Sequence, residues 1–397
     1  MLNSLFQAFK TKMMKNVYLI ALVFSLFNAS QAQNIETLTV SGGKTYGDHK
    51  ILIYTPAEYA DRNRKFEVIY VLDAQQREFF DAVHTTIAFQ TFGIRPMIVV
   101  GISSNNRNYD FLPENKFPET AQEIAGPIGG ASVFSDYIEK KLMPFIEKKY
   151  RVLPFKIGIG FSNGGTFLNY NLLTKPIMFD AIFSIDANLK YDRGQLIDRL
   201  NESANLDSSK LFYYTCLTTS EEKWVESADR FNELLKSKTS MTIEKEVFKT
   251  ETHTTVFQQG IINAIKSFFH HQFTNPERLV IHLKNMEKLG GDAVTKEELH
   301  RIASLYMQYN FVDYARKLLL SFENNLAGEI EDSNDLFSLF ETGKLYYALG
   351  FTDKAKAYFV FCDNKLEQNK NKMSVEFYNF GKEKIKEQLK NIENSKQ

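Results

Sequence analysis

The segment Lys156-Ile-Gly-Ile-Gly-Phe-Ser-Asn-Gly-Gly-Thr166 decides the fold of this chain, because it places an apolar strand directly before a glycine-rich turn. Within it, Gly160-Phe161-Ser162-Asn163-Gly164 has the pattern Gly-x-Ser-x-Gly. The glycines permit a tight turn, and their missing Cβ atoms let the strand and the following helix pack closely. The pattern therefore predicts a sharp elbow that exposes the Ser162 hydroxyl beside the free amides of a helix N-terminus.

Around this segment, from about residue 35 to 273, short apolar runs alternate with amphipathic stretches. The central runs are continuously apolar, which is typical of strands covered on both faces of a parallel sheet. We therefore predict an α/β fold with helices on both faces of the sheet. The predicted strands are Lys50–Tyr54, Glu67–Leu72, Met97–Ile102, Lys156–Ile159, Ala181–Ile185, Leu211–Cys216 and Thr242–Phe248, and the predicted helices are Val133–Tyr150 and Trp224–Leu235.

The balance of charge argues against nucleic acid as a partner. The chain carries 48 basic and 48 acidic side chains, so it has no excess of positive charge to neutralise phosphates. Its two cysteines, Cys216 and Cys362, lie in apolar runs and are expected to be buried free thiols rather than a disulfide framework. We expect neither a metal nor an organic cofactor.

The N-terminal residues 1–32 have the pattern of an export signal. Lys10, Lys12 and Lys15 precede an apolar run over residues 17–27, and the small residues of Ala29-Ser-Gln-Ala32 suit cleavage before Gln33. The run is too short to span a bilayer core of about 30 Å. We therefore expect a periplasmic or secreted protein whose first domain covers residues 33–273.

After Phe273 the strand-like runs end, and a helical region follows. We expect a helical linker over residues 274–294 and a small all-α domain over residues 295–390. Within it, Leu305-Tyr306, Phe311, Asp313 and Ala315 recur forty residues later as Leu345-Tyr346, Phe351, Asp353 and Ala355. This spacing predicts a repeated helix–turn–helix unit that resembles the tetratricopeptide repeat, and residues 295–390 could bind a partner protein or self-associate.

A serine hydroxyl needs a base to take its proton before it can act as a nucleophile. Of the seven histidines, His253 lies in the polar loop 250–255 between the last predicted strand and the last helix of the first domain. In an open α/β sheet this loop emerges at the carboxyl edge of the strands, as does Ser162. The order of serine before histidine is also that of α/β-hydrolases. His253 is therefore the candidate base.

A carboxylate should hold the imidazole and stabilise its cation. Glu221 and Glu222 follow the predicted strand Leu211–Cys216, and Asp186 follows the strand before it. We prefer Glu221, with Glu222 and Asp186 as alternatives. For the developing oxyanion, the expected donors are the backbone amide of Asn163 and that of Ala74 or Gln75.

Seven segments of the first domain, the elbow included, match one family. They are residues 68–73, 99–102, 107–113, 129–134, 144–150, 160–165 and 253–256. On these segments the first domain resembles the Putative esterase family of α/β-hydrolases, which includes enterochelin esterases, S-formylglutathione hydrolase and feruloyl esterases. Phe161 stands where histidine is common in this family, and Asn163 where leucine or methionine is usual.

The resemblance implies serine esterase activity with Ser162 and His253 at the matching catalytic positions and an acid near Glu221. Siderophore trilactones, acetylated or feruloylated glycans and small acyl esters all fit as substrates. The alternative function is a non-catalytic binding or scaffold protein that acts through the helical-repeat domain.

Overall fold

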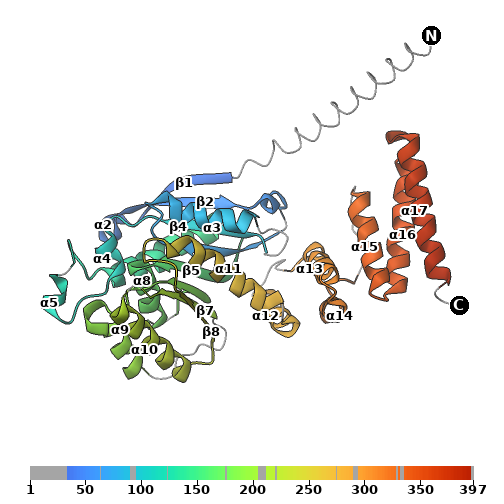
Figure 1. The fold of residues 1–397 in the computed structure, drawn as a ribbon. Coiled ribbons are helices and arrows are strands. Elements are labelled where there is room, and N and C mark those ends of the chain that lie inside the picture. The colour runs from blue at the N-terminus through green and yellow to red at the C-terminus, as the bar shows by residue number, and fades with distance from the viewer. Residues whose placement is uncertain are drawn as a thin grey trace, which may run out of the picture. The chain divides into compact units, whose positions relative to one another are not determined.

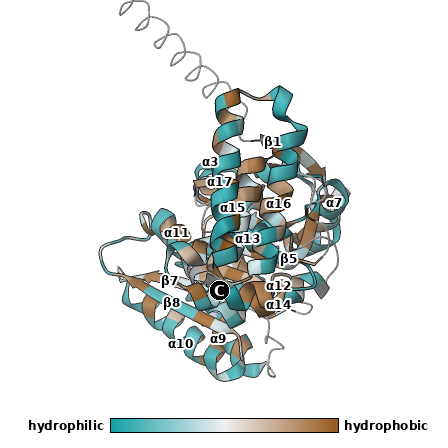
Figure 2. Cartoon of the chain, turned by 90° about the vertical axis from the view of Figure 1, so that its right-hand side faces the viewer, coloured by the Kyte–Doolittle hydropathy of each residue, from teal (hydrophilic) through white to brown (hydrophobic). Residues whose placement is uncertain are grey.

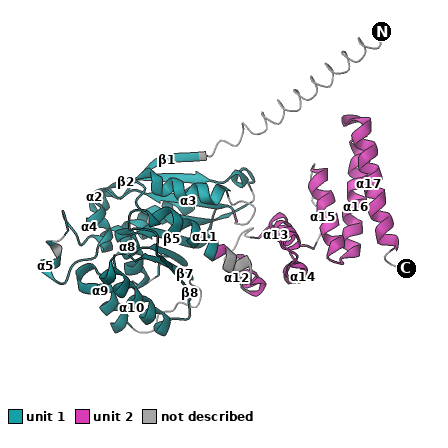
Figure 3. Cartoon of the chain, in the orientation of Figure 1, with its two compact units in different colours: residues 1–91, 96–267 teal, residues 92–95, 268–397 magenta. Residues whose placement is uncertain are grey.

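The computed structural model describes residues 34–62, 64–89, 95–122, 124–174, 177–203, 212–219, 221–273, 275–288, 294–327, 330 and 335–394. The expected export signal lies outside these residues. The chain divides into two compact units, one of residues 1–91 and 96–267 and the other of residues 92–95 and 268–397 (Figure 3). Among the described residues, no helix has the length and apolar character needed to cross a membrane.

The first unit is built on an eight-stranded sheet with the order β1-β2-β4-β3-β5-β6-β7-β8 (Figure 1). β2 is antiparallel to both of its neighbours, and the strands from β4 to β8 run parallel. The strands are β1 Asn34–Ser41, β2 Asp48–Thr55, β3 Phe66–Val71, β4 Met97–Ile102, β5 Val152–Phe161, β6 Ala181–Ile185, β7 Phe212–Thr218 and β8 Thr242–Phe248.

The seven predicted strands are present, and β1 is the strand that the sequence did not predict. β1 lies at the edge of the sheet and pairs with β2 alone. Its side chains are mostly exposed, with Val40 buried, so it lacks the continuous apolar run that marks the central strands. An edge strand that borders solvent needs no such run.

Helices cover both faces of the sheet, as predicted. Ser184 of β6 accepts a hydrogen bond from Asn169 Nδ2 of α8 (2.9 Å). The next residue, Ile185, lies against Gly260 of α11, where a built Cβ would come within 2.9 Å of it. Because successive side chains of a strand point to opposite faces, α8 and α11 lie on opposite sides of the sheet. This arrangement is an α/β-hydrolase fold.

The predicted helix over residues 133–150 is present with an irregularity in the middle. It forms α6 Ala131–Tyr137, a π-helical turn Ile138–Leu142 and α7 Met143–Lys149. Pro144 lies at the start of α7 and has no backbone N–H to donate to the preceding turn. The wider π-helical turn directly before it accommodates that missing bond.

The remaining helices of the first unit connect the strands or extend from its loops. They are α2 Gly43–Tyr46, α3 Arg77–Phe89, α4 Arg107–Phe111, α5 Pro118–Ala121, α8 Asn163–Leu172, α9 Tyr191–Glu202, α10 Glu222–Lys238 and α11 Val256–Phe273, the last of which runs into the second unit, and a 3₁₀ turn covers Ala57–Ala60.

The second unit contains two similar helix–turn–helix pairs. At the first turn Asn310 has φ +59°, and at the second Gly350 has φ +81°. In each turn the amide of the following phenylalanine, Phe311 or Phe351, donates to the carbonyl of Tyr306 or Tyr346 at 2.8 Å. The forty-residue repeat in the sequence is thus a repeat in backbone geometry. The helices are α12 Pro276–Lys288, α13 Lys296–Gln308, α14 Val312–Ser321, α15 Leu336–Ala348, α16 Thr352–Gln368 and α17 Val375–Asn394, with a 3₁₀ turn at Lys370–Lys372.

These helices are amphipathic, and hydrophilic and hydrophobic colours are mixed along them in Figure 2. Ala315 of α14 and Ala355 of α16 are fully buried at equivalent positions of the repeat. Because alanine has a small side chain, α14 can pack closely against α13, and α16 against α15. Arg95 and Glu298, both of this unit, form a buried ion pair with 3.2 Å between Nε and Oε1.

In the first unit, β5 and α8 come into close contact at Gly160. A Cβ built on Gly160 would lie 2.4 Å from the carbonyl oxygen of Gly164 and 2.9 Å from the amide of Gly165. Both contacts are to backbone atoms, which cannot turn aside as a side chain could. The absence of a side chain at Gly160 is therefore a requirement of the elbow.

We expect Gly160→Ala to lower the free energy of unfolding by about 1–3 kcal/mol or more, the usual scale of overpacking. Gly164→Ala is the matched control, because a Cβ there meets its nearest neighbour at an ordinary 3.4 Å. Thermal unfolding followed by circular dichroism measures both. Equal melting temperatures for the two variants would contradict the interpretation.

Candidate active site

Ser162 lies between the end of β5 and the start of α8 with φ +56° and ψ −119°. This conformation is strained for a residue with a side chain, and such strain persists only where the surroundings hold it. The Ser162 amide donates to Ile185 O (3.0 Å), and its carbonyl accepts from the amides of Thr166 (3.0 Å) and Asn188 (3.3 Å). The predicted elbow is therefore present.

His253 connects Ser162 to a carboxylate. Its Nδ1 lies 2.8 Å from Asp186 Oδ2, and its Nε2 lies 3.1 Å from Ser162 Oγ. Because the carboxylate can only accept, Nδ1 carries the ring proton and donates a hydrogen bond to Asp186, which leaves Nε2 to accept a hydrogen bond from the serine hydroxyl. This is the order of contacts that proton removal from a serine requires.

Asp186 is fully buried at the carboxyl end of β6, with φ +43°. Its Oδ1 accepts from the Thr218 amide (3.1 Å), and its Oδ2 accepts from the Thr218 hydroxyl (3.2 Å). The Asp186 amide donates to Cys216 O (3.0 Å). The two strand ends β6 and β7 thus hold this carboxylate in place against the imidazole.

The preference for Glu221 as the acid beside His253 is corrected. Glu221 precedes the first turn of α10, is about half exposed (47%), and forms an ion pair with Lys190. Glu222 is an exposed residue in the first turn of the same helix, where an acidic side chain suits the helix dipole. The carboxylate that contacts His253 is Asp186, one of the two alternatives.

Of the expected oxyanion donors, the Ala74 amide is already used. It donates to Ile102 O at 3.1 Å, so the expectation for Ala74 is corrected. The Gln76 amide, two residues further on, donates to Asp73 O (3.0 Å), and among the described residues no hydrogen bond engages the amide of Gln75 between them. Asn163 is the first residue of α8, and the first amides of a helix have no intrahelical acceptor. Gln75 and Asn163 are therefore the two candidate donors.

Two aromatic rings pack against the imidazole of His253. Phe161 stacks on His253 with ring centroids 4.7 Å apart, and Trp224 meets it edge-on at 4.9 Å. Phe79 and Phe257 continue this wall, because each ring packs against Phe161, at 5.8 and 5.5 Å. No motif singles out Trp224 in the sequence, because it lies on an amphipathic helix and reaches His253 only in the folded chain.

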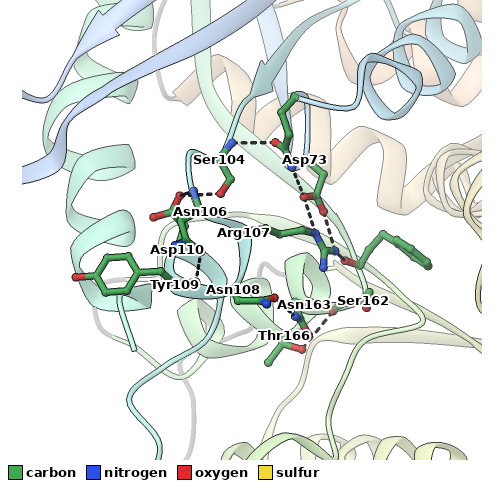
Figure 4. Close-up of polar contacts among 12 residues, drawn as sticks. Asp73, Ser104, Asn106, Arg107, Asn108, Tyr109, Asp110, Ser162, Asn163 and Thr166 are labelled. Carbon is green, nitrogen blue, oxygen red and sulfur yellow. Dashed lines mark hydrogen bonds and ion pairs between the residues drawn. The ribbon is translucent and has the colours of Figure 1, made fainter. Parts of the chain in front are cut away.

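A short series of amides lies beside Ser162. Asn163 Nδ2 donates to Asn108 Oδ1, and Asn188 Nδ2 donates to Asn163 Oδ1, both at 3.1 Å. Figure 4 shows Asn108 and Asn163 meeting next to Ser162. Asn163 is the residue that departs from the family's usual leucine or methionine, and its side chain here is held on both sides.

The Cys216 thiol is fully buried in β7, and this burial raises its pKa. Burial also raises the pKa of Cys362 to about 11. Both thiols are free and buried, and burial favours the neutral thiol over the thiolate that a cysteine nucleophile needs. Within the part of the chain that the structure describes, no group of His, Cys, Asp and Glu side chains is arranged to hold a metal ion.

Two further polar residues lie behind the elbow, and the sequence assigned them no role. Asp73 lies two residues after the end of β3, and Arg107 begins α4. Both belong to segments that carried the family resemblance. A charged residue directly after the predicted strand Glu67–Leu72 was the signal that could have drawn attention to Asp73.

The fold and this constellation define an α/β-hydrolase with a serine elbow. A model of the family described as Putative esterase matches residues 43–254, more than half of the chain. The chain therefore belongs to the Putative esterase family.

Two curated relatives and two solved structures are similar to parts of this chain. The ferri-bacillibactin esterase BesA of Bacillus subtilis is 29% identical over 158 residues, covering 36% of this chain and 54% of BesA. The uncharacterized protein YbbA of the same organism is 27% identical over 151 residues, covering 37% and 59% of the two chains. This chain thus spans between half and two thirds of the length of these relatives.

An IroE-like serine hydrolase from Shewanella oneidensis superimposes with a TM-score of 0.60 and 20% identity, covering 73% of this chain and 99% of its own. An uncharacterised protein from Capnocytophaga ochracea superimposes with a TM-score of 0.51 and 20% identity, covering 83% and 94%. At this identity the likeness shows the fold.

Proposed function

We propose that this chain is an exported serine esterase that cleaves small-molecule carboxylic esters through Ser162, His253 and Asp186. The observation that carries the proposal is the unbroken series of hydrogen bonds from the buried Asp186 carboxylate through His253 to Ser162 at the strained elbow. Membership of the Putative esterase family supports the reaction class. The name of BesA, a ferri-bacillibactin esterase, supports the class of bond that is cleaved.

In the first half of the reaction, His253 Nε2 takes the Ser162 proton while Oγ attacks the carbonyl carbon of the ester. The imidazolium that forms is stabilised by Asp186 across the 2.8 Å contact. The tetrahedral oxyanion accepts hydrogen bonds from the amides of Asn163 and Gln75. His253 then protonates the departing alcohol, and the acyl group stays on Ser162 as an ester.

In the second half, water replaces the alcohol. His253 removes a proton from the water, whose oxygen attacks the acyl carbon, and a second oxyanion forms at the same two amides. When this intermediate collapses, His253 returns the proton to Ser162 Oγ and the carboxylic acid leaves. The cycle consumes one ester and one water, and it uses no redox step.

The aromatic wall of Phe79, Phe161, Phe257 and Trp224 favours esters with an apolar or aromatic group beside the scissile bond. For this reason p-nitrophenyl acetate and butyrate are suitable first substrates. Siderophore trilactones and acylated glycans form the second tier of the substrate screen.

Ser162→Ala should lower kcat for p-nitrophenyl butyrate by about 10³-fold or more, because the nucleophile is removed. The same substitution should abolish covalent labelling by a fluorophosphonate, detected as a mass increase on the intact protein. The proposal fails if the wild-type chain is neither labelled nor active on any ester of the screen, or if Ser162→Ala retains full activity.

Asp186→Asn should lower kcat by about 10²–10⁴-fold, because an amide can donate to Nδ1 and so favour the wrong tautomer of His253. Glu221→Gln is the matched control, since it neutralises an exposed acid that pairs with Lys190, and its kcat should stay within about threefold of wild type. Steady-state kinetics of both variants decides between the two acids. A larger loss in Glu221→Gln than in Asp186→Asn would reverse the assignment.

Export rests on the sequence pattern of residues 1–32. The full-length chain, expressed in a Gram-negative host, should accumulate outside the cytoplasm as a form that begins at Gln33. N-terminal sequencing of the purified protein measures this, and a cytoplasmic protein that keeps residues 1–32 would contradict it. Replacing Leu19 and Leu22 by arginine should keep the precursor uncleaved, because it interrupts the apolar run.

A further inference from the structure

Asp73 and Arg107 form an ion pair behind the nucleophile elbow. Arg107 Nε donates to Asp73 Oδ1 (2.8 Å), and the Nη2 of the same guanidinium donates to Asp73 Oδ2 (2.9 Å). The Asp73 side chain is 1% exposed and that of Arg107 is 32% exposed. The two parallel bonds match the fork of the guanidinium to the two carboxylate oxygens, which fixes their relative orientation as well as their distance.

A third contact joins this pair to the elbow. Arg107 Nη2 also donates to the carbonyl oxygen of Phe161 at 3.0 Å. Phe161 directly precedes Ser162, so the guanidinium holds the peptide group that leads into the strained residue. Figure 4 shows Arg107 between Asp73 on one side and the chain that enters Ser162 on the other.

On its other side, the Asp73 carboxylate holds the loop that follows β3. Asp73 has φ +66°, and its Oδ1 accepts from Gln75 Nε2 at 2.8 Å. The Gln75 side chain reaches further, because its Oε1 accepts from the Ser104 amide at 2.9 Å. Gln75, whose backbone amide is a candidate oxyanion donor, is therefore held through its side chain between Asp73, after β3, and Ser104, after β4.

The two oxyanion donors come from different parts of the chain. Gln75 follows β3, and Asn163 follows β5 and begins α8. Each donor has to lie about 3 Å from one developing oxygen atom, so their separation must be held closely. The bonds from Gln75 through Asp73 and Arg107 to Phe161 form the side-chain connection between these two loops.

We propose that Asp73 and Arg107 are positioning residues that set the distance between the Gln75 and Asn163 amides and so complete the oxyanion site. The inference rests on the proposed esterase function and deepens it. Neither side chain touches the reacting atoms. Asp73 acts through the side chain of Gln75, and Arg107 acts through the backbone carbonyl of Phe161, directly before Ser162.

An arginine is needed for this task because one guanidinium makes all three contacts at once. A lysine keeps the charge, but its ammonium group is a single point that cannot bond both carboxylate oxygens and a carbonyl in the same geometry. Arg107→Lys therefore keeps a cation beside the buried Asp73 while loosening the connection. A misplacement of reacting groups by about 1 Å is enough to lower a rate by about 10²-fold.

The experiment compares Arg107→Lys with Arg151→Lys as a matched control. The Arg151 guanidinium also bonds backbone carbonyls, of Arg64 and Asp61 (both 3.0 Å), but it lies before β5, at the opposite end of that strand from Ser162. Active-site titration with a fluorophosphonate counts competent Ser162, and kcat for p-nitrophenyl butyrate is then expressed per titrated site. This normalisation separates positioning from a loss of folded protein.

We expect Arg107→Lys to lower kcat per titrated site by about 10- to 100-fold with KM within about threefold, because transition-state contacts are lost and substrate binding is kept. The inhibition constant of a trifluoromethyl ketone, which forms a tetrahedral adduct on serine, should rise by a similar factor. Arg151→Lys should leave both quantities within about twofold of wild type.

Asp73→Asn provides the second variant. If the two residues act as a unit, the double variant Asp73→Asn/Arg107→Lys should have a kcat per titrated site only slightly below that of the less active single variant. Unchanged kcat per titrated site in Arg107→Lys, or an equal loss in Arg151→Lys, would overturn the positioning role and leave the esterase proposal standing. Failure of the wild-type chain in titration and turnover would instead overturn the proposed function.

Discussion

The close approach of β5 to α8 at Gly160 is the constraint on which the site depends. Because Gly160 carries only a hydrogen atom, β5 passes the first turn of α8 at a distance that is too short for a residue with a Cβ atom. The turn between them is then so short that Ser162 must adopt φ +56°. Its hydroxyl consequently projects from the carboxyl edge of the sheet, beside the unbonded amides at the start of α8.

Parallel strands bring the other participants to the same edge. β3, β5, β6 and β7 run in the same direction, so the residues that follow them emerge together. Asp73, Ser162, Asp186 and the loop carrying His253 are far apart in the chain but share this edge. The order in the sheet also decides the acid, because β6 is the direct neighbour of β5, and Asp186 therefore lies nearer to the elbow than residues after β7.

Polar contacts behind the site then limit its freedom. Thr218 donates twice to Asp186, and the asparagine series 108, 163 and 188 flanks Ser162. The Asp73–Arg107 pair links the loops after β3 and β5. These hydrogen bonds mainly restrict the conformations of the loops at the carboxyl edge of the sheet. Preorganised donors of this kind are what electrostatic stabilisation of an oxyanion requires.

The sequence by itself determined the α/β class, seven of the eight strands, the elbow at Ser162 and the placement of His253 in the last loop of the sheet. These follow from local pattern, because apolar runs, glycine spacing and chain order are visible in one dimension. The tertiary structure decided that Asp186 rather than Glu221 contacts His253, that Ala74 has its amide occupied, and that Arg107 reaches Phe161 O. Those outcomes depend on which strands are neighbours and on which hydrogen-bond partners come within about 3 Å, and spacing along the chain carries no information about such distances.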